Sequence, residues 1–118
     1  MREEDYKVPF KVIAYAGDSK SQSEKALRAA REGDFEEAKK FLEEAEKGVI
    51  QAHQCQTSLV TEEANGNPVP VNIITVHSQD HLTMALIMSE IADDFINLYQ
   101  RVAELEAKIK ELEEREKN

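Results

Sequence analysis

The sequence has little cysteine and no long apolar run, and each shortage excludes a class of protein. Cys55 is the only cysteine, so an intrachain disulfide, a zinc finger and a cysteine-held iron–sulfur cluster are all excluded. No stretch approaches the ~18 to 20 apolar residues that a membrane-spanning helix needs, so we expect no membrane insertion. The first five residues are polar and no apolar run follows them. We therefore expect no secretory signal and a cytoplasmic location.

Basic residues are also in short supply relative to acidic ones. The chain of 118 residues carries 15 lysines and arginines against 24 aspartates and glutamates, which gives a formal net charge of -9. Such a charge repels the phosphates of nucleic acids and the anionic lipids of membranes, so we expect neither as a partner. The length fits a single domain with its own apolar core.

Two breaks divide the chain into three segments with helical periodicity. At the first break, Gly33 can adopt the left-handed conformation that ends a helix, and Asp34 can accept hydrogen bonds from the free amides of the next one. The second break, NGNPVP at residues 65–70, combines turn formers with two prolines. We predict an all-α, up-down-up bundle of three helices in one domain. The predicted helices cover about residues 8–32, 35–64 and 72–115.

The ends of two segments are less clear than the breaks. Residues 71–76 are rich in β-branched side chains that favour a strand. No other segment could pair with that strand, and unpaired amides are costly, so we predict a helix capped by Asn72. In the first segment the polar residues 19–24 interrupt the apolar stripe, and we expect looser packing there.

The second and third segments each carry an apolar stripe with alternating steps of three and four residues. In the second segment the stripe predicts the core face; its members are Phe35, Ala38, Leu42, Ala45, Val49, Ala52, Gln56 and Leu59. In the third, the spacing is a heptad repeat that should pack against other helices. Its members are His77, His81, Met84, Met88, Ile91, Phe95, Leu98, Val102, Leu105, Ile109 and Leu112. From about residue 103 this stripe resembles a coiled-coil extension, so we expect self-association.

The head of the third helix, VHSQDHL at residues 76–82, holds the most reactive combination of side chains. His77 and His81 are four residues apart and share a helix face, with Asp80 on a neighbouring row. A neutral imidazole can attack phosphorus and form phosphohistidine. Hydrogen bonds to the phosphoryl oxygens could come from Gln79, His81, Ser78 or nearby backbone amides. The same two histidines with a carboxylate could hold a transition metal, or they could be half-buried structural residues. The residues alone leave these three interpretations open.

Two other polar residues are weaker candidates. His53 lies beside the core stripe of the second helix, where a lone histidine is usually structural. Cys55 has no activating base near it in the sequence, which favours a structural thiol over a catalytic one. No arginine or glycine-rich phosphate loop lies near His77, so nucleotide binding is not expected.

Four stretches resemble the enzyme IIA component of the lactose/cellobiose branch of the bacterial sugar phosphotransferase system. Together they span about residues 10–102, and the last stretch is the most specific. The four are IAYAGD at 13–18, AAREGDF at 29–35, AHQCQT at 52–57 and VHSQDHL at 76–82.

The resemblance implies a phosphocarrier that assembles as a homotrimer. His77 matches the family's phosphoryl-accepting histidine, which takes phosphate from the carrier HPr and passes it to a cysteine of enzyme IIB. The relay drives uptake of a β-linked disaccharide such as lactose, cellobiose or chitobiose. Gln79 and His81 match positions near the phosphoryl group, where we expect hydrogen-bond donors. Asp80 matches an aspartate that surrounds a divalent metal, expected to be Mg²⁺, on the trimer axis, where three carboxylates would otherwise repel.

The extension from about residue 103 runs past where the family commonly ends and has an idealised heptad sequence. It motivates a second hypothesis, a structural or engineered helical trimer, with or without a metal, that has no phosphotransfer activity. Labelling by phosphorylated HPr separates the two hypotheses.

Overall fold

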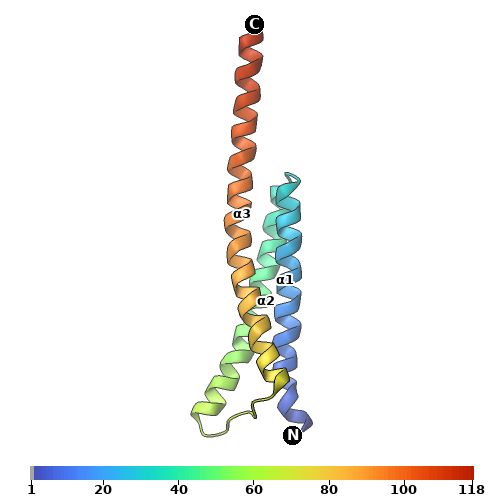
Figure 1. The fold of residues 1–118 in the computed structure, drawn as a ribbon, viewed down its shortest axis with the longest axis vertical. Coiled ribbons are helices and arrows are strands. Elements are labelled where there is room, and N and C mark those ends of the chain that lie inside the picture. Colours follow the sequence, from blue (N-terminus) through green and yellow to red (C-terminus); the bar gives the residue numbers. More distant parts are fainter. Residues whose placement is uncertain (1) are drawn as a thin grey trace.

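The computed structural model describes residues 2–118, and Met1 of the predicted domain lies outside it. A 3₁₀ turn over Glu3–Tyr6 precedes three helices that run up, down and up, and the third continues far beyond the turn joining the other two (Figure 1). The helices are α1 (Lys7–Arg31), α2 (Phe35–Ala64) and α3 (Ile73–Lys117). The predicted all-α bundle is confirmed, and each predicted helix end lies within two residues of the observed one.

The first two helices end in the same way, with a glycine in the left-handed region. Gly33 has a φ of 88° and Gly66 a φ of 86°. The amide of Asp34 donates back to the carbonyl of Ala29 at 2.9 Å, and the residues after α2 repeat this pattern. The left-handed conformation costs an L-residue about 1 to 2 kcal/mol, which is why glycine stands at both ends.

Both predicted helix caps are confirmed. The Asp34 carboxylate accepts a hydrogen bond from the amide of Glu37 at 3.1 Å, at the start of α2. The Asn72 side chain accepts one from the amide of Thr75 at 2.9 Å, at the start of α3. The alternative of a strand at residues 71–76 is therefore wrong, because this cap commits most of that segment to helix.

The polar run in α1 is a place of close helix contact, so the expectation of looser packing there is wrong. Ser19 and Ser23 are fully buried, and the Ser19 hydroxyl donates to the carbonyl of Ala45 in α2 at 2.6 Å. Opposite Ser19 stands Gly48, where an added Cβ would lie only 2.9 Å from the Cβ of Ser19. Small side chains on both helices let the two backbones approach each other more closely than larger ones would.

The face of α3 that packs inside the chain is different from the predicted heptad stripe. The buried residues of α3 are Ser78, Leu82, Ala85, Ser89, Ala92 and Ile96. The predicted stripe is largely exposed: Ile91 is 43%, Leu98 54% and Leu105 58% accessible. The expectation that this stripe packs against other helices is therefore not met within one chain. The serines and alanines of the inward face let α3 lie close to its neighbours, although they give a weak hydropathy signal.

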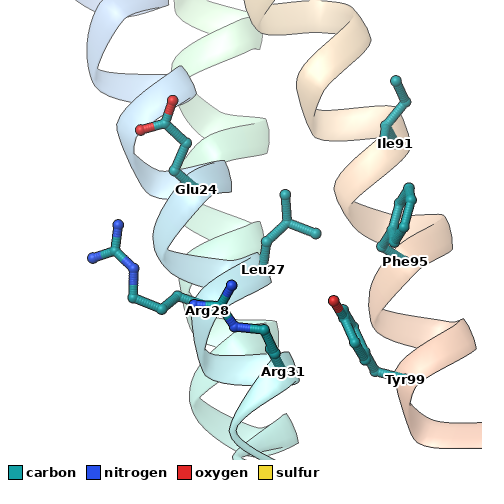
Figure 2. A pocket seen from close by; sticks show the side chains of 7 residues that line it. All are labelled: Glu24, Leu27, Arg28, Arg31, Ile91, Phe95 and Tyr99. Carbon is teal, nitrogen blue, oxygen red and sulfur yellow. The ribbon is translucent and has the colours of Figure 1, made fainter. Parts of the chain in front are cut away.

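The predicted heptad stripe faces outward and is called the outward stripe below. It borders a hollow of about 360 Å³ between α1 and α3. Figure 2 shows Leu27 of α1 facing Phe95 and Tyr99 of α3, with Arg28 and Arg31 along the α1 side. Toward its C-terminus α3 extends past the turn that joins α1 and α2 (Figure 1). All residues from 101 to 118 are exposed, and the molecule measures 76 × 21 × 19 Å.

The close contact between α1 and α2 predicts opposite effects of one substitution at two glycines. We expect Gly48→Ala to lower the free energy of unfolding by about 1 to 3 kcal/mol, because its Cβ would collide with Ser19 and overpack the contact. Gly17→Ala, in α1 with no heavy atom within 4 Å of the added Cβ, should instead raise it by about 0.5 to 1 kcal/mol through helix propensity. Urea titration followed by circular dichroism measures both, and a stabilising Gly48→Ala would contradict the close contact.

Candidate functional site

The two histidines of the VHSQDHL motif contact each other at the head of α3. The Nε2 atoms of His77 and His81 lie 3.0 Å apart, and the rings meet edge to face with centroids 4.4 Å apart. His77 is exposed and His81 half-buried. A hydrogen bond between two imidazole nitrogens needs one donor and one acceptor, so one ring must present an unprotonated nitrogen. Which ring accepts depends on the tautomer, and His77 is the more accessible of the two.

Asp80 lies with His77 on the same exposed side of α3. Both line a hollow of about 350 Å³ whose other walls are the apolar residues Ile73, Ile74 and Val76. Ile73 is 79% and Val76 52% accessible. The site thus combines an exposed nitrogen, an exposed carboxylate and an apolar collar, which together could receive another macromolecule.

Gln79 lies on a different side of α3 from His77. Its side-chain amide donates to the Gln56 side chain of α2 at 2.5 Å and to the Ser78 hydroxyl at 3.3 Å. The Ser78 hydroxyl in turn donates to the carbonyl of Thr75 at 2.6 Å. Residues two apart on a helix do not face each other, so the structure does not bring Gln79 to His77. Its expected role as a phosphoryl donor stays a prediction.

The described residues of one chain form no complete metal site. Among residues 2–118, no three histidine, cysteine, aspartate or glutamate side chains lie close enough together to hold an ion. Asp80 offers one carboxylate, and His77 and His81 are turned toward each other. A hard divalent cation prefers several oxygen ligands, so Asp80 could hold one only together with carboxylates from other copies of the chain.

The weaker candidates lie away from this cluster. His53 is exposed on α2, and its carbonyl accepts a hydrogen bond from the Thr57 hydroxyl at 2.9 Å. Cys55 is a half-buried free thiol that packs against the core cluster containing Val12 and Ala52. The packing of Cys55 fits the structural role expected for it, whereas the structural role expected for His53 stays a prediction.

Sequence reasoning did not identify Gln56 as a partner of the site, nor the apolar collar at Ile73 and Val76. Gln56 was expected in the core face of α2, and a polar residue on that face was the available signal for a buried hydrogen bond. The collar lies in the segment whose β-branched residues suggested a strand. The exposure of the collar depends on where α2 lies relative to α3, and the sequence alone does not predict that position.

No helix among residues 2–118 is both long and apolar enough to cross a bilayer.

Residues 7–100 match the sequence model of the family described as PTS system, Lactose/Cellobiose specific IIA subunit. The exposed part of α3 beyond residue 100 lies outside this match.

Individual relatives agree with the family match. The chain is 36% identical over 100 residues to the PTS system lactose-specific EIIA component of Staphylococcus epidermidis, covering 85% of this chain and 96% of that protein. Among solved structures, the PTS cellobiose-specific enzyme IIA from Bacillus anthracis superposes with a TM-score of 0.84 at 32% identity, covering 87% and 94% of the two chains. A IIA(Chitobiose)–HPr complex from Escherichia coli gives a TM-score of 0.74 at 28% identity, covering 86% and 99%.

The contact between Gln79 and Gln56 predicts that the two residues depend on each other for stability. We expect Gln79→Ala and Gln56→Ala each to lower the free energy of unfolding by about 1 kcal/mol, because each removes one partner of a half-buried hydrogen bond. The double variant should lose less than the sum, with a coupling of about 0.5 to 1 kcal/mol. Denaturant titration of the four proteins measures the coupling. Additive losses would show that the two amides do not interact.

Proposed function

Since the chain belongs to the lactose/cellobiose-specific IIA family of the sugar phosphotransferase system, we propose that it carries phosphate on His77. In this proposal His77 receives the phosphoryl group from HPr and passes it to a cysteine of enzyme IIB, in the cytoplasm. The observation that carries the proposal is the exposed His77 nitrogen paired with His81 at 3.0 Å. The structural likeness to the IIA protein of a IIA(Chitobiose)–HPr complex supports HPr as the donor.

The first transfer needs an unprotonated nitrogen on His77. When His81 Nε2–H donates to His77 Nε2, the His77 lone pair is free of a proton, and it attacks phosphorus once the donor approaches. The new N–P bond forms as the N–P bond of the donor's phosphohistidine breaks, and the electron pair returns to the donor's imidazole. The N–H of His81 must leave the His77 nitrogen before this attack, because both use the same lone pair; it turns to a phosphoryl oxygen and stabilises its charge.

The second transfer reverses the roles. A thiolate of enzyme IIB attacks phosphorus, an S–P bond forms, and the N–P bond to His77 breaks, so the nitrogen regains its lone pair and its contact with His81. Both partners must place a reactive atom against the same exposed nitrogen. The apolar collar at Ile73 and Val76 is the surface against which each of them docks in turn.

Assembly as a homotrimer explains why α3 keeps an apolar face in solvent. The outward stripe of α3 has heptad spacing, and three copies packed along it would bury side chains such as Ile91 and Leu98, now 43% and 54% accessible. His77 heads this stripe, so the three phosphoryl sites would lie near the junctions between copies.

Asp80 flanks the head of the same stripe, and three copies packed along it would bring three of its carboxylates near one another. Three negatively charged carboxylates close together repel one another. This repulsion opposes either their ionisation or the assembly of the trimer unless a cation neutralises them. Carboxylate oxygens are the ligands that Mg²⁺ prefers, so the residues present fit the ion. Bound there, Mg²⁺ would supply charge neutralisation. His77 and its partners would perform the transfer.

The sugar is expected to be a β-linked disaccharide such as lactose, cellobiose or chitobiose. The names of the relatives support this class, since they include lactose-specific, cellobiose-specific and chitobiose proteins. The phosphoryl site itself contains nothing that reads a sugar.

Incubation with HPr phosphorylated at its histidine, with ³²P as the label, tests the carrier role. We expect acid-labile label on the wild-type chain, none on His77→Ala, and transfer onward to enzyme IIB. His81→Ala should slow labelling about a hundredfold, because one hydrogen-bond donor to the transferred group is lost. His53→Ala, an exposed histidine on α2, is the matched control and should label at the wild-type rate. A folded wild-type chain that takes no label would contradict the proposal.

Thermal unfolding with and without Mg²⁺ tests the role of Asp80. We expect Mg²⁺ to raise the wild-type melting temperature by about 5 °C at saturating concentration, because it binds only the assembled state. Asp80→Asn should assemble without the ion and show no such shift, whereas the control Asp94→Asn, also exposed on α3, should keep it. A full Mg²⁺ response in Asp80→Asn would exclude Asp80 as the ligand.

A further inference from the structure

The last part of α3 projects past the turn that joins α1 and α2 (Figure 1). Residues 101–118 are all exposed, and they lie beyond the segment that matches the family. Most helical stability in proteins comes from packing of an apolar face rather than from helix propensity. The outward stripe continues through this segment without a break: Val102, Leu105, Ile109 and Leu112 keep the steps of three and four, at 41% to 58% accessibility. An uninterrupted apolar stripe on an exposed helix needs a covering partner.

The charges beside this stripe are sorted by sign. If Val102 and Ile109 take the first heptad position (a) and Leu105 and Leu112 the fourth (d), the two flanking positions are e and g. The g positions hold Arg101 and Lys108, and the e positions hold Glu106 and Glu113. One edge of the stripe is therefore basic and the other acidic.

This distribution of charge determines whether two copies of the helix pair favourably in a parallel or in an antiparallel direction. In a parallel, in-register pair, each g side chain meets the e side chain five residues later on its neighbour. Arg101 would meet Glu106, and Lys108 would meet Glu113. In an antiparallel pair, g meets g and e meets e, so like charges would face each other. Among residues 2–118 none of these four charges has an ion-pair partner within its own chain, whereas Arg115 pairs with Glu111 at 2.8 Å.

We propose that residues 101–117 form a parallel, in-register coiled coil between copies of this chain, held in direction by Arg101–Glu106 and Lys108–Glu113 pairs. The partner is a second copy because the basic and acidic edges of one helix complement those of an identical parallel helix. The number of strands, three, rests on the proposed trimer, but the direction does not, and neither requires phosphate transfer at His77.

The coiled coil would clamp the assembly at the end away from the site. Asp80, the proposed metal ligand, lies outside residues 101–117. The coiled coil would therefore hold the copies together even when Mg²⁺ is absent. It would also fix the copies parallel, which places every His77 at the same end of the assembly. In an antiparallel pair centred on residue 109, each His77 would lie 32 residues from the centre, which at about 1.5 Å per residue separates the two sites by roughly 95 Å.

Charge reversal in the full-length chain tests the register. Arg101→Glu with Lys108→Glu places acidic residues against Glu106 and Glu113, and should weaken self-association by at least about tenfold in 50 mM salt. Adding Glu106→Lys and Glu113→Lys should restore it to within about threefold. The matched control, Lys110→Glu with Lys117→Glu, changes the net charge equally away from the seam and should have little effect.

Sedimentation equilibrium in EDTA measures these dissociation constants, so metal binding at Asp80 does not contribute. The loss should shrink in 1 M salt, because the pairs are exposed and screened. Equal loss in the matched control, or no rescue by the second pair of reversals, would overturn the proposed pairing. Labelling of His77 by phosphorylated HPr is measured separately on the same variants, so failure of the carrier role is distinguishable.

A cysteine cross-link tests the direction. In a Cys55→Ser background, Glu116→Cys puts a thiol at position a, where parallel copies bring identical residues together, and mild oxidation should yield covalent dimers rapidly. Glu114→Cys, at position f on the far side of the helix, is the control and should yield few. Equal yields, or no cross-link at residue 116 in protein that self-associates, would overturn a parallel coiled coil.

Discussion

The structure depends on a constraint in α3, which carries two apolar faces on a single helix. A chain with two other helices covers only one of them. The inward face, built from serines, alanines, Leu82 and Ile96, packs inside the chain. The outward face keeps large side chains in solvent from Met84 to Leu112. Hydrophobic burial favours covering the second face too, and this is the physical basis of the proposed assembly.

The same division of faces positions the chemistry. His77 and Asp80 lie at the head of the outward side, where a partner protein or another copy can reach them. Ser78 and Gln79, one and two residues from His77, turn the other way, and Gln79 fastens α3 to Gln56 of α2. The packing of the inward face, together with this hydrogen bond, sets the rotation of α3 about its own axis. That rotation decides which side chains remain available for transfer and assembly.

The sequence predicted well those features that are decided by local backbone chemistry. Gly33, Asp34 and Asn72 marked helix ends because their roles depend only on nearby amides and carbonyls. The helical contact between His77 and His81 followed from their spacing. The inward face of α3 could not be predicted from hydropathy, because close approach selects small residues and the larger side chains mark the other face. The tight contact of Ser19 with Gly48 was hidden for the same reason, and Gln79 was expected beside His77 because nothing local reveals Gln56 as its partner.

Nuclear Overhauser spectroscopy on a mixture of isotope-labelled and unlabelled chains tests most directly whether the outward face of α3 joins copies in the proposed phosphocarrier. Isotope filtering selects contacts between different molecules. The account predicts intermolecular contacts from the methyl groups of Met84, Ile91, Leu98 and Leu105, and none from Leu82 or Ile96. Intermolecular contacts confined to the inward residues, or none from the outward stripe in concentrated protein, would contradict it.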